Sequence, residues 1–320
     1  MPIVKPSEMN FDCKKFYAII YGETGIGKTT VAQSAPKPFT IDLDRGMERV
    51  SARHRSIMTQ VDNYAELLVD LESDEFKECE TVVIDTGGAL ISLMQRVAIA
   101  ADKVNRQADG TISIRGHGAV KKMFNDFVGR LINVYKKNIV FLFHSVEEMK
   151  KQGGQDFKVN RILCEGSAKN LVWQPADFGG FMFVDEQGKR RIGFSSQEHF
   201  HAKGSYGITG VREISTLGPA DANNFLTKLF DEARANIAKD AEFFESEKKD
   251  YVRVMGQGAK LVEEINDIET ANAFAEKLNQ LNHKITSKSE IGAMAKERIA
   301  ELGLTWDKDK KAWVQKAVES

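Results

Sequence analysis

The sequence predicts an α/β fold in which a mostly parallel sheet is flanked by helices, with a β-hairpin at the sheet edge and a small helical C-terminal domain. Three observations indicate this class. Short apolar runs alternate with longer segments of helical periodicity in the first half of the chain, which is typical of β-α units. Two β-like segments joined by a short turn follow near residue 185. After about residue 230 the chain becomes helical in pattern and densely charged with both signs.

Four apolar runs are predicted as the main strands, and helical patterns separate them. The strands cover Phe16–Tyr21, Pro38–Leu43, Thr81–Asp85 and Asn138–His144. The helices cover residues 28–34, 63–76, 88–104 and 117–136, and the last of these carries its apolar residues on one face. Because such a face must be buried, we expect these helices to cover the sheet.

A β-hairpin is predicted where Phe178–Asp185 and Arg190–Ser195 are joined by a turn that contains Gly188. We expect this hairpin to extend the edge of the sheet. The change of composition after Phe230 predicts a domain boundary there. The boundary divides the chain into a core of residues 1–230 and a charged helical domain of residues 231–320.

The C-terminal domain is predicted to contain helices over residues 231–266 and 269–303, the first of them interrupted near Gly256. A small hairpin is predicted around a charged turn between Trp306 and Trp313. The two tryptophans suit a cap that packs on the helices. Aromatic rings beside lysines also suit base stacking, so a nucleic-acid platform is the alternative.

Composition limits the partners and the compartment. The 320 residues carry a formal net charge of −1, so contact with nucleic acid or an anionic membrane would need local patches. Cys13, Cys79 and Cys164 form no C-x-x-C pair, which favours reduced thiols over disulfides or a zinc site. The N-terminal residues lack an apolar signal core, and no run is long enough to span a bilayer. We therefore expect a cytoplasmic protein without membrane contact, in the host cytoplasm if a phage encodes it.

The segment GETGIGKT directly follows the first predicted strand and has the pattern of a phosphate-binding loop. Its glycines let backbone N–H groups face the phosphates, Lys28 can reach the β- and γ-phosphate oxygens, and the Thr29 hydroxyl can ligate Mg²⁺. The pattern predicts binding of ATP or GTP, and a chance match in a glycine-rich turn is the alternative. The predicted nucleotide-binding residues are Gly22, Glu23, Thr24, Gly25, Ile26, Gly27, Lys28, Thr29 and Thr30.

Acidic residues end two of the predicted strands. Asp85 ends the third strand, where a carboxylate lies beside the phosphate loop and can hold Mg²⁺ through water. Asp42 and Asp44 lie at the end of the second strand, and alternation puts them on the same side of it. We expect Asp44 to be the base that deprotonates the attacking water, and Asp42 to be a supporting or structural acid. A capping or turn role for both is the alternative.

His144 follows the apolar part of the fourth strand and is expected at the same edge of the sheet. A polar side chain there can hydrogen-bond the γ-phosphate or its water and so distinguish ATP from ADP. We expect His144 to act as such a sensor rather than as a proton shuttle. The alternative is a polar residue with no functional role.

The order of these motifs resembles the RecA-like ATPases of bacteriophages, and in particular the Sak-type single-strand-annealing and recombination group. The matching segments are GETGIGKT, TIDLDRG, TVVIDT and IVFLFHS, within residues 16–230. The resemblance implies a RecA-like P-loop core that hydrolyses ATP with Mg²⁺, with a catalytic carboxylate at Asp44, a magnesium acid at Asp85 and a switch residue at His144. The family usually has Glu where Asp44 stands, so the shorter side chain predicts slower hydrolysis.

The same resemblance implies contact with single-stranded DNA through two loops. The loops are residues 105–118 and 147–161, and the predicted contacts are Arg106, Arg115, Lys150, Lys151, Lys158 and Arg161. Glycine together with lysine and arginine suits a loop that follows a phosphate backbone. Plain solvated loops are the alternative.

Lys203 resembles the basic finger that RecA-like proteins supply to the nucleotide of a neighbouring subunit. This resemblance implies a homo-oligomer, either a ring or a filament. The family often has a second basic residue where Ser205 stands, and a surface lysine with no role is the alternative. His199 and His201 lack the accompanying acids or cysteines of a metal site.

Two functions are compatible with these features. The first is an ATPase that assembles on single-stranded DNA and exchanges or anneals strands. The second is a nucleotide-dependent mediator or loader that binds a recombinase or a single-strand-binding protein through its charged C-terminal helices, with little DNA-stimulated hydrolysis. A small-molecule kinase is a third possibility, which the lack of an acceptor-site motif disfavours.

Overall fold

The computed structural model describes residues 14–152, 155–165, 168–217 and 221–315. These residues form two compact units, which divide between residues 237 and 238. The division falls inside the long helix α7 (Phe225–Glu263), slightly beyond the boundary that the composition predicts. Cys13 and the two glycines at positions 153 and 154 lie outside the described residues.

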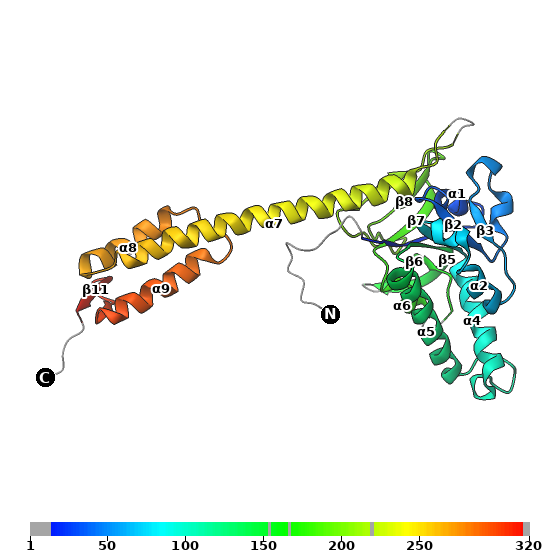
Figure 1. Ribbon diagram of the computed structural model, residues 1–320, viewed down its shortest axis with the longest axis horizontal. Helices are drawn as coiled ribbons and strands as arrows, with labels where there is room; N and C mark the ends of the chain where they lie inside the picture. The colour runs from blue at the N-terminus through cyan, green and yellow to red at the C-terminus, as the bar shows by residue number, and fades with distance from the viewer. Residues whose placement is uncertain (1–13, 153–154, 166–167, 218–220, 316–320) are drawn as a thin grey trace. The chain divides into compact units, whose positions relative to one another are not determined.

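The first unit is built on a sheet of nine described strands in the order β3-β2-β4-β5-β1-β7-β8-β9, with β6 paired to β5 (Figure 1). The six strands from β3 to β7 in this order are parallel. Strands β8 and β9 extend the sheet beyond β7 as antiparallel neighbours, and β6 is antiparallel to β5. The predicted α/β class with a mostly parallel sheet and an edge hairpin is therefore confirmed. The strands are β1 (Tyr17–Gly22), β2 (Pro38–Asp42), β3 (Ile57–Thr59), β4 (Thr81–Asp85), β5 (Asn138–Gln152), β6 (Gln155–Ile162), β7 (Phe178–Val184), β8 (Arg190–Gly193) and β9 (Val211–Glu213).

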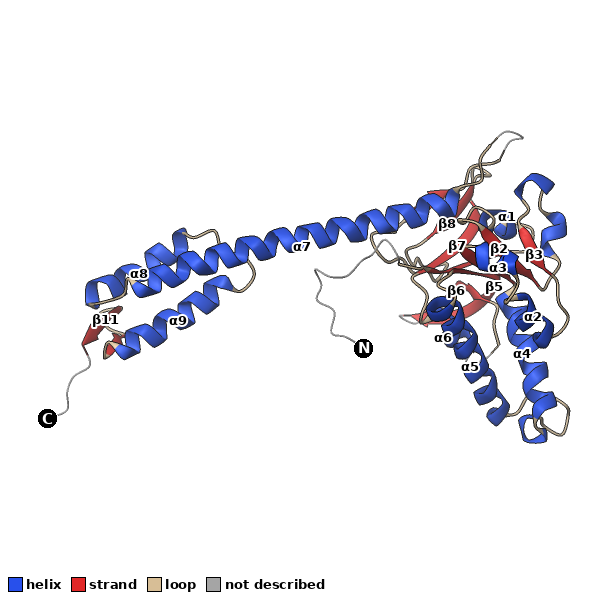
Figure 2. Ribbon diagram, viewed as in Figure 1, coloured by secondary structure: helices blue, strands red, loops and turns tan. Residues whose placement is uncertain are grey.

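Helices flank this sheet (Figure 2). They are α1 (Lys28–Ala32), α2 (Tyr64–Asp70), α3 (Asp74–Glu78), α4 (Gly87–Ala101), α5 (Ile114–Gly129), α6 (Ala168–Trp173) and the first part of α7. Short 3-10 helices lie at Gly46–Arg49, Ala52–His54 and Lys103–Asn105, and a π-helical turn lies at Arg130–Val134. Among the helices described for this chain, none has the length and apolar character needed to cross a membrane.

The alternating side chains of β1 enter two separate hydrophobic cores, one on each face of the sheet. Tyr17, Ile19 and Tyr21 belong to the core that also contains apolar side chains of α4 and α5. Ala18 and Ile20 belong to the core that contains apolar side chains of α1 and α7. Because every residue of β1 is buried, this strand lies at the centre of the unit, and the phosphate loop that follows it has a rigid support.

Two of the predicted helices differ from the structure because serine side chains cap helices that the pattern of apolar residues does not reveal. The single helix predicted over residues 63–76 is two helices, since the Ser73 hydroxyl accepts a hydrogen bond from the Phe76 N–H (3.2 Å) and starts α3. Helix α5 begins earlier than predicted, since the Ser113 hydroxyl accepts from the Gly116 N–H (3.1 Å).

The second unit consists of the remainder of α7, α8 (Ile268–Gln280), α9 (Ser287–Glu301) and a hairpin of β10 (Leu304–Asp307) and β11 (Ala312–Gln315). The helices and the hairpin share one core of apolar side chains. Trp306 and Trp313 face each other across the hairpin with ring centroids 5.2 Å apart. Trp313 packs against the core, whereas Trp306 is 47% exposed, so one ring caps the helices and the other lies largely in solvent.

The predicted helix break near Gly256 is wrong, because α7 continues through Gly256 and Gly258. Gly258 instead allows α9 to approach closely. A Cβ atom at this position would lie 2.2 Å from Cδ1 of Ile291, whose side chain is fully buried, whereas a Cβ at Gly256 would meet nothing within 4 Å. The glycine at 258 thus serves packing rather than chain flexibility.

We expect Gly258→Ala to destabilise the second unit and Gly256→Ala, its matched control, to leave that unit intact. Overpacking of a filled core costs about 1–3 kcal/mol, whereas alanine in an open helical position is favourable. Thermal unfolding and limited proteolysis of the full chain measure the effect. Equal stabilities of the two variants would contradict the packing role of Gly258.

Candidate active site

The phosphate loop leaves β1 at Gly22 and enters α1 at Lys28. Gly25 (φ 80°) and Gly27 (φ 99°) adopt left-handed backbone conformations that other residues rarely adopt. The Lys28 ammonium donates hydrogen bonds to the carbonyl oxygens of Gly22 (3.0 Å) and Glu23 (2.7 Å), so the side chain lies back across the loop. Burial lowers the pKa of Lys28, and the nearby carboxylates oppose this shift. The loop therefore holds a cation where phosphate oxygens would lie.

A threonine and an acid meet beside this loop. The Thr29 hydroxyl donates a hydrogen bond to Oδ2 of Asp85 at 2.6 Å. Asp85 ends β4 and is 4% exposed. Burial, together with the carboxylates of Asp42 and Asp44, raises the pKa of Asp85 to about 6 even though the Thr29 hydrogen bond opposes the shift. A buried carboxylate whose charged form is disfavoured in this way is stabilised by a cation.

These oxygens fit Mg²⁺. The ion prefers oxygen ligands and often keeps several waters while it binds substrate phosphates and one or two protein groups, so Thr29 and Asp85 would suffice. The described residues contain no cluster of three or more acids, histidines or cysteines that could hold a metal by itself. Gly46 keeps space open here, since a Cβ there would lie 2.6 Å from Oδ2 of Asp85.

Asp44 lies at the same edge and is held in place by a hydroxyl. The Thr86 hydroxyl donates to Oδ2 of Asp44 (2.8 Å), and Nε2 of His144 lies 3.9 Å from the same oxygen. The Asp44 side chain remains 35% exposed, so water can reach it. A cavity of about 350 Å³ borders Asp44, Thr86 and His144. Asp44 is thus positioned to accept a proton from a molecule in this cavity.

His144 connects this carboxylate to the phosphate loop. Its Nδ1 lies 3.2 Å from the Thr24 hydroxyl, while its Nε2 faces Asp44. Burial, and secondly the charge of Lys28, lowers the pKa of His144, and Asp44 opposes the shift. The ring is therefore neutral near pH 7, and it can donate or accept one hydrogen bond toward a bound phosphate.

Asp42 has a different environment. It is 1% exposed, and its carboxylate accepts hydrogen bonds from the backbone N–H of Gly46 (2.7 Å) and Met47 (3.3 Å) and from Nε2 of Gln60 (2.8 Å). These three donors fix the turn after β2, which carries Asp44. The Asp42 carboxylate therefore organises this turn, as expected of a supporting or structural acid.

Strand register explains why these distant residues meet. Gly22 pairs with His144 across β1 and β5, and Asp42 pairs with Asp85 across β2 and β4. Asp85 pairs in turn with Leu142 of β5, two residues before His144. The carboxyl ends of β1, β2 and β4 therefore lie beside this part of β5, at the edge where open α/β sheets bind ligands. The structure brings Lys28, Thr29, Asp44, Asp85 and His144 together within one network of contacts.

One basic residue, Arg190, lies beside the phosphate loop although no sequence motif predicts it as a site residue. The Arg190 guanidinium lies 3.7 Å from the position that a Cβ of Gly27 would occupy. The adjacent Arg191 is paired with Asp185 (2.8 Å) and Glu213 (3.0 Å), whereas no described carboxylate lies within ion-pair distance of Arg190. Arg190 begins β8, and only the folding of this hairpin against the loop reveals its place.

Arg190 borders a large cavity. Its volume is about 1230 Å³, and it begins at the end of the phosphate loop. The cavity is bordered by Gly27, Thr30, Val31, Arg53, Arg190 and Asn223, among others. Asn223 donates a hydrogen bond to the Thr30 carbonyl (2.7 Å) and so joins the segment before α7 to α1. The cavity has room for a nucleoside next to phosphates bound on the loop.

The two predicted DNA-contacting loops have more structure than expected. Residues 147–161 belong largely to an antiparallel ribbon of β5 and β6, not to an open loop. Lys150 and Lys151 lie on β5, and Lys158 and Arg161 on β6 pair with Glu147 (3.0 Å) and Glu148 (3.4 Å) respectively. The alternation of apolar and charged residues along this segment could have revealed the ribbon.

The other predicted loop, residues 105–118, is partly helical. Arg106 forms a β-bridge to Ile112, and α5 already includes Arg115. This segment connects the C-terminal end of α4 to α5, whereas Asp85 lies just before the N-terminal end of α4. The two predicted loops therefore come from different structural elements.

The contacts of Lys203 are with residues of the first unit. Its ammonium donates to the carbonyl oxygen of Gln174 (3.1 Å), and its backbone forms a bridge to Gly179 of β7. The neighbouring His201 stacks on Trp173 with ring centroids 4.7 Å apart. Within this single chain Lys203 makes no described contact with the phosphate loop, so a role as a finger would require a neighbouring subunit.

The raised pKa of Asp85 predicts a pH-dependent stability in the absence of ligand. The folded state binds this proton more tightly than the unfolded state, so the group lowers the stability as pH rises from about 4 to about 6. Asp85→Asn removes that loss. We expect the unfolding midpoint of the variant, relative to the wild type, to increase across this range. A difference that stays constant from pH 4 to pH 7 would contradict the assignment.

Comparisons with known proteins add a family and a partial structural likeness. A family model described as an AAA domain matches residues 14–206. The search of curated proteins found no match. Among solved structures, the chain is similar to a prototypical ATPase from the type III secretion system of pathogenic bacteria, with 12% identity and a TM-score of 0.34. That match covers 52% of this chain and about half (52%) of the other chain.

Proposed function

Because the chain belongs to the AAA domain family, whose members are P-loop ATPases, we propose that it hydrolyses ATP with Mg²⁺ as a RecA-like recombination ATPase of the phage Sak type. Single-stranded DNA would stimulate this hydrolysis, and the protein would act as an oligomer. The convergence of Lys28, Thr29, Asp44, Asp85 and His144 at one sheet edge carries the proposal for the chemistry.

The roles follow from the contacts. Lys28 neutralises charge on the β- and γ-phosphates. Thr29 and Asp85 would hold Mg²⁺, which when bound neutralises the phosphates and orients them. Asp44 accepts the proton of the attacking water, and Thr86 fixes the orientation of this carboxylate through its hydroxyl.

His144 would report the nucleotide state. Its ring contacts the Thr24 hydroxyl of the phosphate loop and lies 3.9 Å from the Asp44 carboxylate. The residue belongs to β5, which continues without interruption into the β5–β6 ribbon. A change in its hydrogen bonds on loss of the γ-phosphate can therefore move the ribbon that carries Lys150 and Lys151. This continuity supports the coupling of hydrolysis to DNA binding.

Arg190 is proposed to bind the phosphates or the nucleoside from within the same chain. We expect Arg190→Ala to weaken ATP binding by about 10- to 150-fold, the size of one charge-assisted contact of about 1.5–3 kcal/mol, with a smaller effect on the rate at saturation. Isothermal titration with a slowly hydrolysed ATP analogue measures the affinity. The matched control is Arg191→Ala, which removes a guanidinium that is already paired with Asp185 and Glu213 and does not border the cavity. Equal affinities of the two variants would exclude the contact.

The alternative function is a mediator or loader that binds a recombinase or a single-strand-binding protein. The long charged helix α7 and the exposed Trp306 of the second unit favour it. The two functions differ in one observable: ATP hydrolysis with and without an oligonucleotide. We expect strong stimulation by single-stranded DNA. A rate of ATP hydrolysis that single-stranded DNA does not change, together with binding of a recombinase or a single-strand-binding protein, would support the alternative and contradict the proposal.

The oligomer is tested separately. A homo-oligomer would let Lys203 of one subunit reach the nucleotide of the next, as the resemblance implies. Light scattering of the full chain with an ATP analogue and an oligonucleotide gives the mass of the assembly. A monomeric mass under all of these conditions would contradict both the proposed oligomer and the role of Lys203 as a finger.

A further inference from the structure

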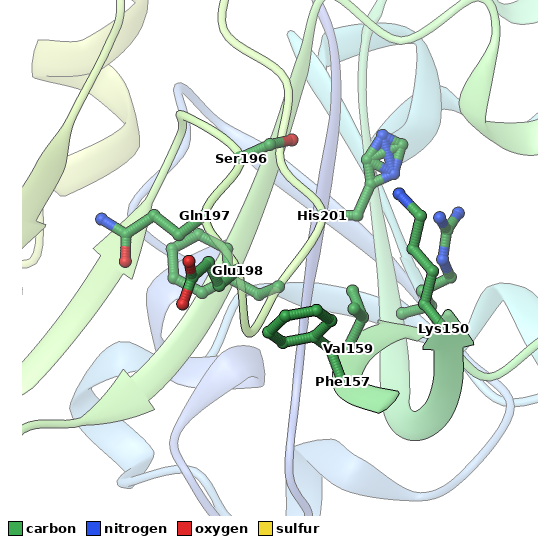
Figure 3. A pocket seen from close by; sticks show the side chains of 9 residues that line it. Lys150, Phe157, Val159, Ser196, Gln197, Glu198 and His201 are labelled. Carbon is green, nitrogen blue, oxygen red and sulfur yellow. The ribbon is translucent and has the colours of Figure 1, made fainter. Parts of the chain in front are cut away.

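A third cavity, of about 360 Å³, lies between the β5–β6 ribbon and the segment 196–201 (Figure 3). Phe157 and Val159 reach it from β6, and Lys150 reaches it from β5. Ser196, Gln197 and Glu198 border it on the other side. The mechanism of hydrolysis uses none of these side chains.

Its floor is apolar and aromatic. Val159 and Phe200 are buried beneath it (7% and 4% exposed), while Phe157 is partly open. Phe200 is itself packed on Phe181 and Phe183, with ring centroids 5.1 and 5.8 Å away. Phe157 and Val159 are two residues apart on β6 and therefore lie on the same face of the ribbon. A flat aromatic ligand that enters the cavity therefore finds the ring of Phe157 beside a rigid apolar surface.

The two sides of the cavity differ in charge. Lys150 and His201 lie together on one side, and Gln197 and Glu198 lie on the other (Figure 3). Lys150 forms no ion pair with any described carboxylate, whereas Arg161 forms an ion pair with Glu148. Burial, and secondly the charges of Arg161 and Lys150, lowers the pKa of His201, so its ring stays neutral and leaves Lys150 as the free cation.

We propose that this cavity binds one base of a single-stranded nucleic acid, with the adjoining phosphate on Lys150. The inference rests on the proposed DNA-binding function and names the site for it. Phe157 would stack on the base. Gln197 and Glu198 would face the polar edge of the base, where the Glu198 carboxylate accepts hydrogen bonds from amino or imino groups. A single strand is required because bases in a duplex are stacked and are not free to enter.

The cavity is connected to the phosphate loop. Tyr21, the residue before Gly22, directs its hydroxyl to the carbonyl oxygens of Asn160 (3.0 Å) and His201. These carbonyls belong to the two segments that border the cavity, β6 and residues 196–201. A base that moves these segments therefore acts on the end of β1, where the phosphate loop begins. This contact supplies a route from the DNA site to the nucleotide site.

Fluorescence anisotropy of the full chain with a labelled oligothymidylate and a slowly hydrolysed ATP analogue tests the site. Stacking on one aromatic ring changes the affinity by about tenfold, so we expect that loss for Phe157→Ala and none for Phe157→Tyr. Lys150→Ala is expected to weaken binding and to reduce its salt dependence. The matched controls are Phe244→Ala and Lys122→Ala, exposed residues outside the cavity, which should bind as the wild type does.

Photocrosslinking with 5-iododeoxyuridine in the oligonucleotide locates the base. We expect the crosslink on Phe157 and its loss from Phe157→Ala. A wild-type chain that binds the oligonucleotide but crosslinks elsewhere, with unchanged affinity of both cavity variants, would overturn this inference and leave the proposed function intact. A wild-type chain that does not bind the oligonucleotide would overturn both. Displacement by thymidine monophosphate at equal concentration would identify a free nucleotide as the occupant and overturn the single-strand assignment.

Tyr21→Phe tests the connection by itself. The variant keeps the ring in the core and loses only the hydroxyl. We expect it to bind the oligonucleotide as the wild type does and to lose the stimulation of ATP hydrolysis. Stimulation equal to that of the wild type would exclude this route between the two sites.

Discussion

Lys28→Ala is expected to abolish hydrolysis of ATP. Its ammonium is buried (6% exposed) and donates to the Gly22 and Glu23 carbonyls, from where it can turn to the β- and γ-phosphates. Loss of a preorganised charge of this kind costs a factor of about 10²–10³ in rate. Steady-state release of phosphate by the purified full chain measures the effect.

The control for this prediction is Lys37→Ala. Lys37 is a surface residue that pairs with Glu80 at 2.9 Å and lies outside the phosphate loop. Because exposed ion pairs contribute little to stability, this variant should hydrolyse ATP at the wild-type rate. A folded Lys28→Ala protein that still hydrolyses ATP at the wild-type rate would contradict a role of the phosphate loop in hydrolysis.

Asp44→Asn is expected to bind ATP and to lose turnover. The amide can still accept the Thr86 hydrogen bond, so the geometry around the nucleotide is kept, but it cannot take a proton from water. General-base catalysis contributes about 10²–10⁴ to a rate, and the loss should lie in this range. Calorimetric titration with ATP gives the affinity, and a single-turnover assay gives the chemical rate.

Two further variants make the Asp44 prediction specific. Asp44→Glu restores a carboxylate with a longer reach and should retain turnover. Asp42→Asn replaces an acid that organises the turn through the Gly46, Met47 and Gln60 donors, so it should lower the unfolding temperature. Full turnover by Asp44→Asn would show that another group activates the water.

The sequence was sufficient for the elements whose signals are local. The phosphate loop follows a fully buried strand, and β4 has the bounds that its apolar run predicts. Because β1, β2, β4 and β5 are parallel neighbours, their polar terminal residues had to meet at one edge. The proximity of Asp44, Asp85 and His144 could be predicted for that reason.

The failures have equally physical causes. The sequence predicts a loop in place of the β5–β6 ribbon because apolar and polar residues alternate only over residues 157–160, whereas residues 147–152 are mostly charged. The continuous helix through Gly258 is not predicted because the reason for this glycine lies on α9. Arg190 and the cavity beneath Phe157 depend on contacts between segments far apart in the chain. No local pattern encodes such contacts.

The central claim is that one metal-bound triphosphate lies among Lys28, Thr29, Asp44, Asp85 and His144. A crystal structure of the chain with ADP, Mg²⁺ and aluminium fluoride tests it most directly. We expect the fluoride group between the Lys28 ammonium and the Asp44 carboxylate, a water in line with it on Asp44, and the metal ion beside Thr29 and Asp85. Phosphates bound away from Lys28, or a metal ion coordinated at another edge of the sheet, would contradict the account.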